Sequence, residues 1–137
     1  MSYTVALFGE AEKGEYRTAY FCQTLYQLAE NLGEPPSDSK GLHYAVQSLL
    51  YRRNLIFFRV KEEGFSRQDY LLGLRFLEDS QFVSDLTAIC MPGVGDCAII
   101  EASEAVCYAH NSFLIAGEAD LYDYLTDTAI PSEQEYL

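Results

Sequence analysis

The stretch LTAICMPGVGDCAIIEASEAVCYAHNSFLIA, residues 86–116, decides the fold. It begins with an apolar run, passes through a turn that contains two glycines, and enters a segment with helical apolar spacing from Asp96 to His110. Two polar residues then lead into a second apolar run at 113–116. Near-continuous apolar runs are typical of strands that are covered on both faces. A strand, a helix and another strand in this order predict a right-handed crossover between parallel strands.

The same alternation continues on the N-terminal side of this stretch. Apolar runs predict strands at residues 3–8, 55–60, 86–91 and 113–116. Apolar residues at helical spacing predict helices at residues 16–32, 42–53, 66–78, 96–110 and 119–127. The alternation predicts an α/β fold, and more narrowly a three-layer Rossmann-like (flavodoxin-like) domain with a four- or five-stranded, mostly parallel sheet. We expect a single domain over residues 1–130 and a flexible tail over 131–137.

Polar residues mark the starts of two predicted helices. Ser66, followed three residues later by Asp69, is a variant of the capping box, in which two side chains bond to each other's backbone N–H groups. Asp96 is well suited to act as an N-cap, because its carboxylate can accept hydrogen bonds from the first turn. Both residues are therefore predicted helix starts.

The net charge of −12 is unevenly distributed along the 137 residues. All nine Lys and Arg lie at or before Arg75, together with nine acids, so that part is neutral, and the other twelve acids (21 − 9 = 12) lie beyond it. The absence of a basic stripe excludes a conventional nucleic-acid binder. No apolar run approaches the roughly 20 residues of a membrane span, and the N-terminus lacks the basic start of a signal peptide. We therefore expect an acidic cytoplasmic protein that binds neither nucleic acid nor membrane.

The four cysteines show neither zinc-site spacing nor a secreted disulfide pattern. Cys22, Cys90 and Cys107 stand in apolar surroundings and are predicted to be small core residues. The chain also has no GxGxxG and no P-loop motif. We expect no metal and no cofactor.

Candidate ligand-binding residues follow the predicted strands, because ligands of open α/β sheets bind beyond the carboxyl ends of the strands. Gly9 and Glu10 follow the first strand. The segment after the third strand contributes Pro92, Gly93, Gly95 and Asp96. Its glycines would let the backbone approach a ligand at the N-terminus of the next helix. The alternative is that these glycines only reverse the chain direction.

Glu101 is the candidate catalytic residue. It stands between apolar residues in the helix predicted over 96–110. A carboxylate on the sheet side of that helix would be partly buried and could act as a nucleophile or as a general acid or base. The alternative is a solvated residue on the outer helix face.

The run PGVGDCAIIEASEAVCYAHNSFLIA, from Pro92, resembles the corresponding run of Rossmann-like nucleoside-processing families. These are the nucleoside 2-deoxyribosyltransferases and the lysine-decarboxylase-like (LOG) phosphoribohydrolases. The resemblance implies a nucleoside-like ligand and cleavage of its N-glycosidic bond. It implies Glu101 as the catalytic carboxylate, Gly93, Gly95 and Asp96 as the ligand turn, and Gly9 as the start of the first ligand loop.

A non-catalytic role in protein binding is the alternative hypothesis. The acidic C-terminal part would contact a basic protein partner, and Tyr122 and Tyr124 would supply aromatic anchors. The same tyrosines could instead be half-buried packing residues. Pairing into a homodimer through the helices predicted at 16–32 or 42–53 is compatible with either function.

Overall fold

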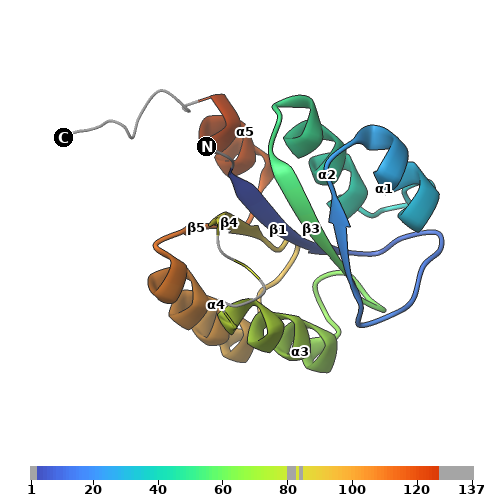
Figure 1. Ribbon diagram of the computed structural model, residues 1–137. Coiled ribbons are helices and arrows are strands. Elements are labelled where there is room, and N and C mark those ends of the chain that lie inside the picture. The colour runs from blue at the N-terminus through green and yellow to red at the C-terminus, as the bar shows by residue number, and fades with distance from the viewer. Residues whose placement is uncertain (1–2, 80–82, 84, 127–137) are drawn as a thin grey trace.

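The computed structural model describes residues 3–79, 83 and 85–126, and its core is a five-stranded sheet (Figure 1). The strands are β1 (Thr4–Gly9), β2 (Ala19–Cys22), β3 (Asn54–Arg59), β4 (Leu86–Cys90) and β5 (Phe113–Ile115). The helices are α1 (Leu25–Leu32), α2 (Gly41–Leu50), α3 (Arg67–Glu78), α4 (Cys97–His110) and α5 (Glu118–Thr126). The predicted α/β fold is confirmed. The tail predicted at 131–137 lies outside the described residues.

The strand order of the sheet is β2-β3-β1-β4-β5. β1 pairs in parallel with β3 and β4, and β4 pairs in parallel with β5. Of the five described strands only β2 is antiparallel, and it pairs with β3 at one edge of the sheet. The mostly parallel sheet is thus confirmed and is consistent with a Rossmann-like fold. After β1, the chain first adds β2 and β3 on one side of β1 and then adds β4 and β5 on the other side. The reversal of strand order therefore lies between β1 and β4.

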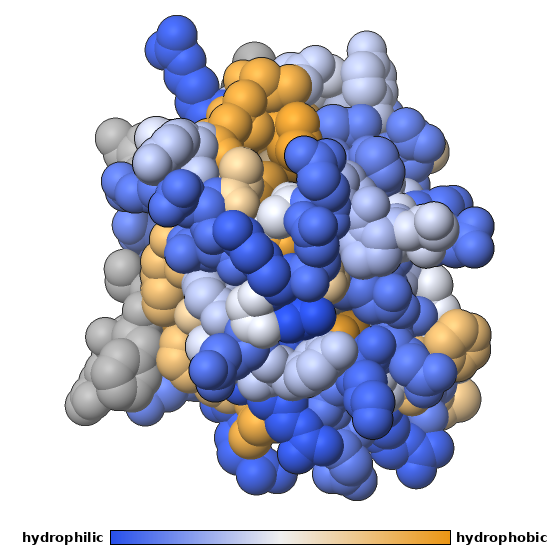
Figure 2. Space-filling view, turned by 90° about the vertical axis from the view of Figure 1, so that its right-hand side faces the viewer, coloured by the Kyte–Doolittle hydropathy of each residue, from blue (hydrophilic) through white to orange (hydrophobic). Residues whose placement is uncertain are grey.

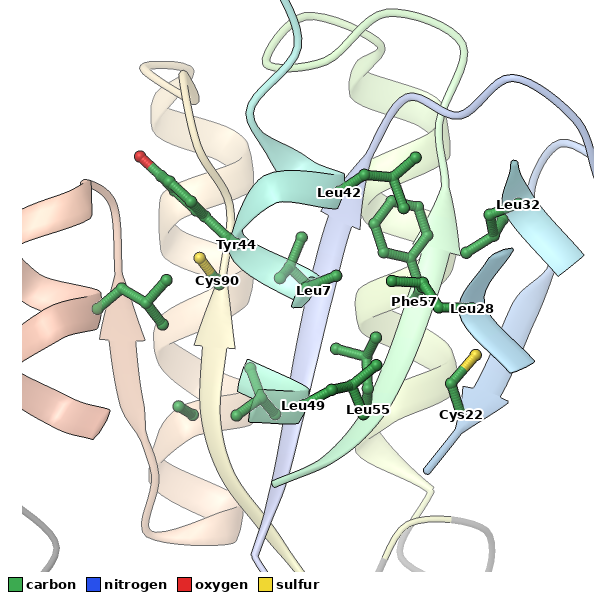
Figure 3. Packing of buried hydrophobic residues seen from close by; sticks show 14 of the residues in the cluster. Leu7, Cys22, Leu28, Leu32, Leu42, Tyr44, Leu49, Leu55, Phe57 and Cys90 are labelled. Atoms are coloured by element: carbon green, nitrogen blue, oxygen red, sulfur yellow. The ribbon is translucent and has the colours of Figure 1, made fainter. Parts of the chain in front are cut away.

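Helices cover both faces of the sheet. Figure 1 shows α1, α2 and α5 on one face and α3 and α4 on the other. Each face has its own cluster of buried apolar side chains. In the first cluster, Leu7 of β1 and Phe57 of β3 lie beneath Leu42 of α2, as Figure 3 shows. Because β1 and β3 carry buried side chains on both faces, the buried part of each strand is a continuous apolar run.

The helix predicted over residues 16–32 is wrong in its first half. Residues 19–22 form strand β2, and α1 begins only at Leu25. Arg17 precedes the strand with a positive φ of 57°, which is incompatible with a continuing helix. The aromatic residues of 16–22 fit helical spacing, but aromatic residues also favour strands. Residues 19–22 form a strand because they pair with β3.

The two predicted helix caps have different outcomes. Asp96 caps α4, and its carboxylate accepts hydrogen bonds from the N–H groups of Ala98 and Ile99. The capping box predicted at Ser66 is wrong, because the Ser66 side chain makes no cap bond to α3. Asp69 is instead buried and forms an ion pair with Arg17. The carboxylate is drawn away from the helix start by a cation that is distant in the sequence.

The cysteines are free thiols. Cys22 and Cys90 are buried as predicted, Cys107 is partly buried, and Cys97 is exposed at the start of α4. Burial raises the pKa of the Cys90 thiol well above its usual range, so this side chain behaves as a protonated core residue. Within the described ranges, no helix has the length and apolar character needed to cross a membrane.

Candidate functional site

The carboxylate of Glu63 occupies the edge of the sheet where a ligand was predicted. Glu63 lies four residues beyond the end of β3. Its Oε1 accepts hydrogen bonds from the N–H of Glu10 at 3.1 Å, the N–H of Gly41 at 3.1 Å and the hydroxyl of Ser39 at 2.8 Å. Its Oε2 accepts the N–H of Lys40 at 2.7 Å. The carboxylate thus joins the loop after β1 to the start of α2.

This arrangement is that of an anion bound at a helix N-terminus. The first N–H groups of a helix have no partner within the helix and carry partial positive charge. The residue before α2, Lys40, makes no side-chain cap bond, and Glu63 takes over that function. Glu10 completes the contact, because its Oε2 accepts the Glu63 N–H at 2.9 Å. Donors that would bind an anionic ligand are therefore already engaged.

Gly9 has a packing role at this point. A Cβ on Gly9 would lie 2.9 Å from the Gly41 Cα and 2.8 Å from the Glu63 Oε1. The glycine lets the end of β1 approach the start of α2 closely enough for the Glu63 contacts to form. Gly9 and Glu10, the predicted ligand residues after the first strand, thus lie against a side chain of the same chain.

The turn after β4 contacts the loop that carries Glu63. A Cβ on Gly64 would lie 2.7 Å from the carbonyl oxygen of Gly93, so the two backbones are in direct contact. Gly93 has a positive φ of 82°, which favours glycine. Pro92 is buried and Gly95 faces open space. The positive φ gives Gly93 a structural reason to be glycine, and the close approach gives Gly64 one.

A buried tyrosine lies behind this contact. The Gly64 N–H donates to the Tyr70 hydroxyl oxygen at 2.6 Å, and Tyr70 is fully buried. Desolvation raises the pKa of Tyr70 far above its usual value, and the neighbouring carboxylates of Glu63, Glu10 and Asp69 raise it further. The hydroxyl is therefore neutral and serves as a hydrogen-bonding support for the loop.

Asp96 connects two helices. Its Oδ1 accepts the N–H of Ala98 at 2.8 Å and of Ile99 at 3.3 Å, and its Oδ2 lies 2.7 Å from Nη2 of Arg67 at the start of α3. The hydrogen bond from Arg67 is the main cause of a lowered pKa for Asp96. The predicted ligand residue is thus engaged as a helix cap and an ion-pair partner.

We expect Asp96→Ala to lower the Tm at neutral pH, because α4 loses its cap and its link to α3. The folded-state pKa of Asp96 is lowered, so its stabilisation is complete above the ordinary aspartate pKa and is lost as the pH falls through the folded-state value. Thermal melts of both proteins across the acid range test this. The Tm difference between wild type and variant should shrink at low pH. A constant difference would show that the ionised Asp96 carboxylate does not stabilise the fold.

Of the two interpretations of Glu101, the structure supports the solvated residue on the outer helix face and not the partly buried carboxylate. Glu101 is exposed on α4, whose buried side chains are Ile99, Ser103 and Val106. The apolar residues beside Glu101 in the sequence lie on other sides of the helix, because successive helical residues are about 100° apart. Glu101 therefore lacks the buried environment on which its proposed chemistry depended. Among the described residues, no three His, Cys, Asp or Glu side chains gather to hold a metal ion.

The two predicted anchor tyrosines differ in exposure. Tyr122 of α5 is 60% exposed. Tyr124 is partly buried, its hydroxyl is hydrogen-bonded to Thr87, and its ring centroid lies 5.2 Å from the guanidinium of Arg53. Tyr124 is thus a packing residue, whereas Tyr122 is exposed.

Hollows that the sequence did not predict lie beside β2. A groove of about 530 Å³ is bounded by β2, Phe58 of β3 and the outer face of α3. A second hollow of about 310 Å³ shares Phe21 with it and extends toward Gln27 and Asn54. Phe21 borders both hollows, but the sequence did not indicate this because its segment was predicted as a helix.

Comparisons with known proteins found no relative. No family model matches the chain, and neither a curated protein nor a solved structure matches it.

Proposed function

We propose that this chain is a non-catalytic protein-interaction module, a three-layer flavodoxin-like domain that binds a basic protein partner. The binding surface is the acidic edge, which we define as Phe113 of β5 with Glu118, Asp120, Tyr122 and Asp123 of α5. One observation carries the proposal: β5 and α5 present exposed aromatic residues and exposed carboxylates, in a part of the sequence that has no Lys or Arg.

The aromatic residues of the acidic edge are suited to anchor a partner. Phe113 is 67% exposed on an edge strand, and Tyr122 is exposed on α5. Aromatic side chains supply large contact area at low entropic cost and are enriched at the centres of interfaces. The ring centroids of Phe113 and Tyr124 are 6.4 Å apart in an edge-on contact, which helps to orient the Phe113 ring.

The carboxylates of the acidic edge supply the charge. Glu118, Asp120 and Asp123 are exposed, and within the described part of the chain none of them forms an ion pair. Opposite charges on a partner would accelerate association and orient the complex. The sheet edge with Glu63 offers less support for ligand chemistry, because its donors are engaged by that side chain.

A labelled peptide that alternates Leu with Lys and Arg tests the proposal by fluorescence anisotropy. We expect binding that weakens as salt is raised, because exposed charges are screened. Tyr122→Ala should weaken binding about tenfold, equivalent to about 1.4 kcal/mol. Charge reversal at Asp120 and Asp123 should weaken it further.

The matched control is Tyr26→Ala on α1, an exposed tyrosine away from the acidic edge. It should leave the affinity unchanged. Absence of binding to the basic peptide, or equal losses for Tyr26→Ala and Tyr122→Ala, would overturn the proposal.

A further inference from the structure

Tyr44 of α2 is a buried residue whose hydroxyl group is not used by the fold. It belongs to the apolar cluster of its face and is 4% exposed. Tyr20, Tyr70 and Tyr124 each use the hydroxyl in a hydrogen bond to another part of the chain. Among the described residues, the Tyr44 hydroxyl has no such partner. Buried tyrosine hydroxyls are usually bonded, so this oxygen is left to a molecule outside the fold.

Carboxylates surround the strand end at which this hydroxyl lies. Figure 3 shows the Tyr44 hydroxyl directed away from the cluster, past the end of β4 at Cys90. The pKa of Tyr44 is raised by burial, by Cys90 and by the carboxylates of Glu118 and Glu63, in this order. After burial, Glu63 and Asp120 likewise raise the pKa of the Cys90 thiol. The hydroxyl is therefore neutral, and its oxygen can accept a hydrogen bond.

The start of α5 is open to an approaching molecule. Glu118 and Asp120 are exposed, and a Cβ on Gly117 would meet nothing within 4 Å. In the part of the chain that the structure describes, neither carboxylate forms an ion pair. This end of the sheet also adjoins the reversal of strand order between β1 and β4, where open α/β sheets bind ligands. The position thus offers hydrogen-bond acceptors and negative charge without a cation.

We infer that Tyr44, Glu118 and Asp120 bind an arginine side chain of the basic protein partner, an inference that rests on the proposed function. A guanidinium has several N–H donors in a planar fork, so it can donate to the Tyr44 hydroxyl and to a carboxylate at once. A lysine ammonium is a point charge and depends less on such a fixed pair of acceptors. A metal ion is less suited, because no three acidic, His or Cys side chains gather among the described residues.

Fluorescence anisotropy with three labelled peptides tests the inference on the full chain. The peptides alternate Leu with Arg, with Lys, or with citrulline, which has the shape of arginine but no charge. We expect the Arg peptide to bind most tightly and the citrulline peptide to bind about tenfold more weakly. Tyr44→Phe should weaken binding of the Arg peptide about fivefold, the usual contribution of one hydrogen bond, and should affect the Lys peptide less. Glu118→Gln should weaken binding of both basic peptides.

The matched control is Tyr26→Phe, which removes the hydroxyl of an exposed tyrosine on α1. Figure 1 shows α1 and β5 on opposite sides of the molecule. Figure 2 faces the α1 side, where hydrophobic areas are separated by hydrophilic surface. Tyr26→Phe should bind the Arg peptide as the wild type does. Tyr44→Phe should keep the Tm of the wild type, because the lost hydroxyl has no partner among the described residues.

The outcomes separate this inference from the proposed function. Wild-type affinity of Tyr44→Phe for the Arg peptide would overturn the inference and leave the proposed function intact. A lowered Tm of Tyr44→Phe would reveal a structural role for the hydroxyl and would overturn the inference as well. Absence of binding by both basic peptides, or equal binding of the citrulline peptide, would overturn the inference together with the proposed function.

Discussion

Glu63→Ala is expected to lower the free energy of unfolding by about 2–3 kcal/mol, which is a large part of the stability of a small domain. The carboxylate accepts hydrogen bonds from three backbone N–H groups and one hydroxyl, and its removal leaves these donors without their partner. Ser39 is buried, so water replaces the lost bond poorly there. Urea denaturation of the wild type and the variant measures the difference.

The neighbouring Glu62→Ala is the control, because Glu62 is exposed and should change stability by less than about 0.5 kcal/mol. Inorganic sulfate supplies a second readout. If the Glu63 carboxylate occupies an anion site, sulfate should raise the Tm of Glu63→Ala more than that of the wild type. A Glu63→Ala protein as stable as Glu62→Ala would show that these hydrogen bonds contribute nothing to stability.

Gly73→Ala is expected to destabilise the protein by about 1–3 kcal/mol, the usual cost of overpacking a core. In an exposed helix interior the same change would be stabilising by about 1 kcal/mol. Here a Cβ would collide with the Phe8 ring and lie 2.9 Å from Cδ2 of Phe58. Both rings belong to the buried cluster on the α3 face and have little room to move.

Thermal and urea denaturation of Gly73→Ala and Gly95→Ala provide the comparison. A Cβ on Gly95 meets nothing within 4 Å, and its backbone φ is not positive. We therefore expect the free energy of unfolding of Gly95→Ala to lie within about 0.5 kcal/mol of that of the wild type. A stabilised Gly73→Ala protein would contradict the tight packing of α3 on β1 and β3.

The sequence predicted the strands of the sheet interior well because burial on both faces requires continuous apolar runs. β2 was missed because its four residues at the sheet edge are not continuously buried, and because they are stabilised by pairing with β3 more than 30 residues away. Local spacing alone does not distinguish such a strand from a helix.

The sequence indicated which loops lie at the candidate site, but it did not indicate which side chain occupies it. The rule for open α/β sheets located the loops after β1 and β4, and the structure brings the loop after β3 into contact with both. The sequence placed Glu62 and Glu63 next to each other after a strand, and only tertiary contacts decide which of the two turns inward. Likewise, the apolar residues next to Glu101 in the sequence did not show that Glu101 lies on the exposed face of α4.

The carboxylate at the start of α2 has a consequence for any molecule that would compete for this crevice. Glu63 is covalently attached to the loop that it closes, so it acts as a tethered ligand whose effective concentration is on the order of millimolar or higher. A free anion must displace it before reaching Gly41 and Lys40. The protein thereby retains the geometry of an anion site and uses it to connect its own loops.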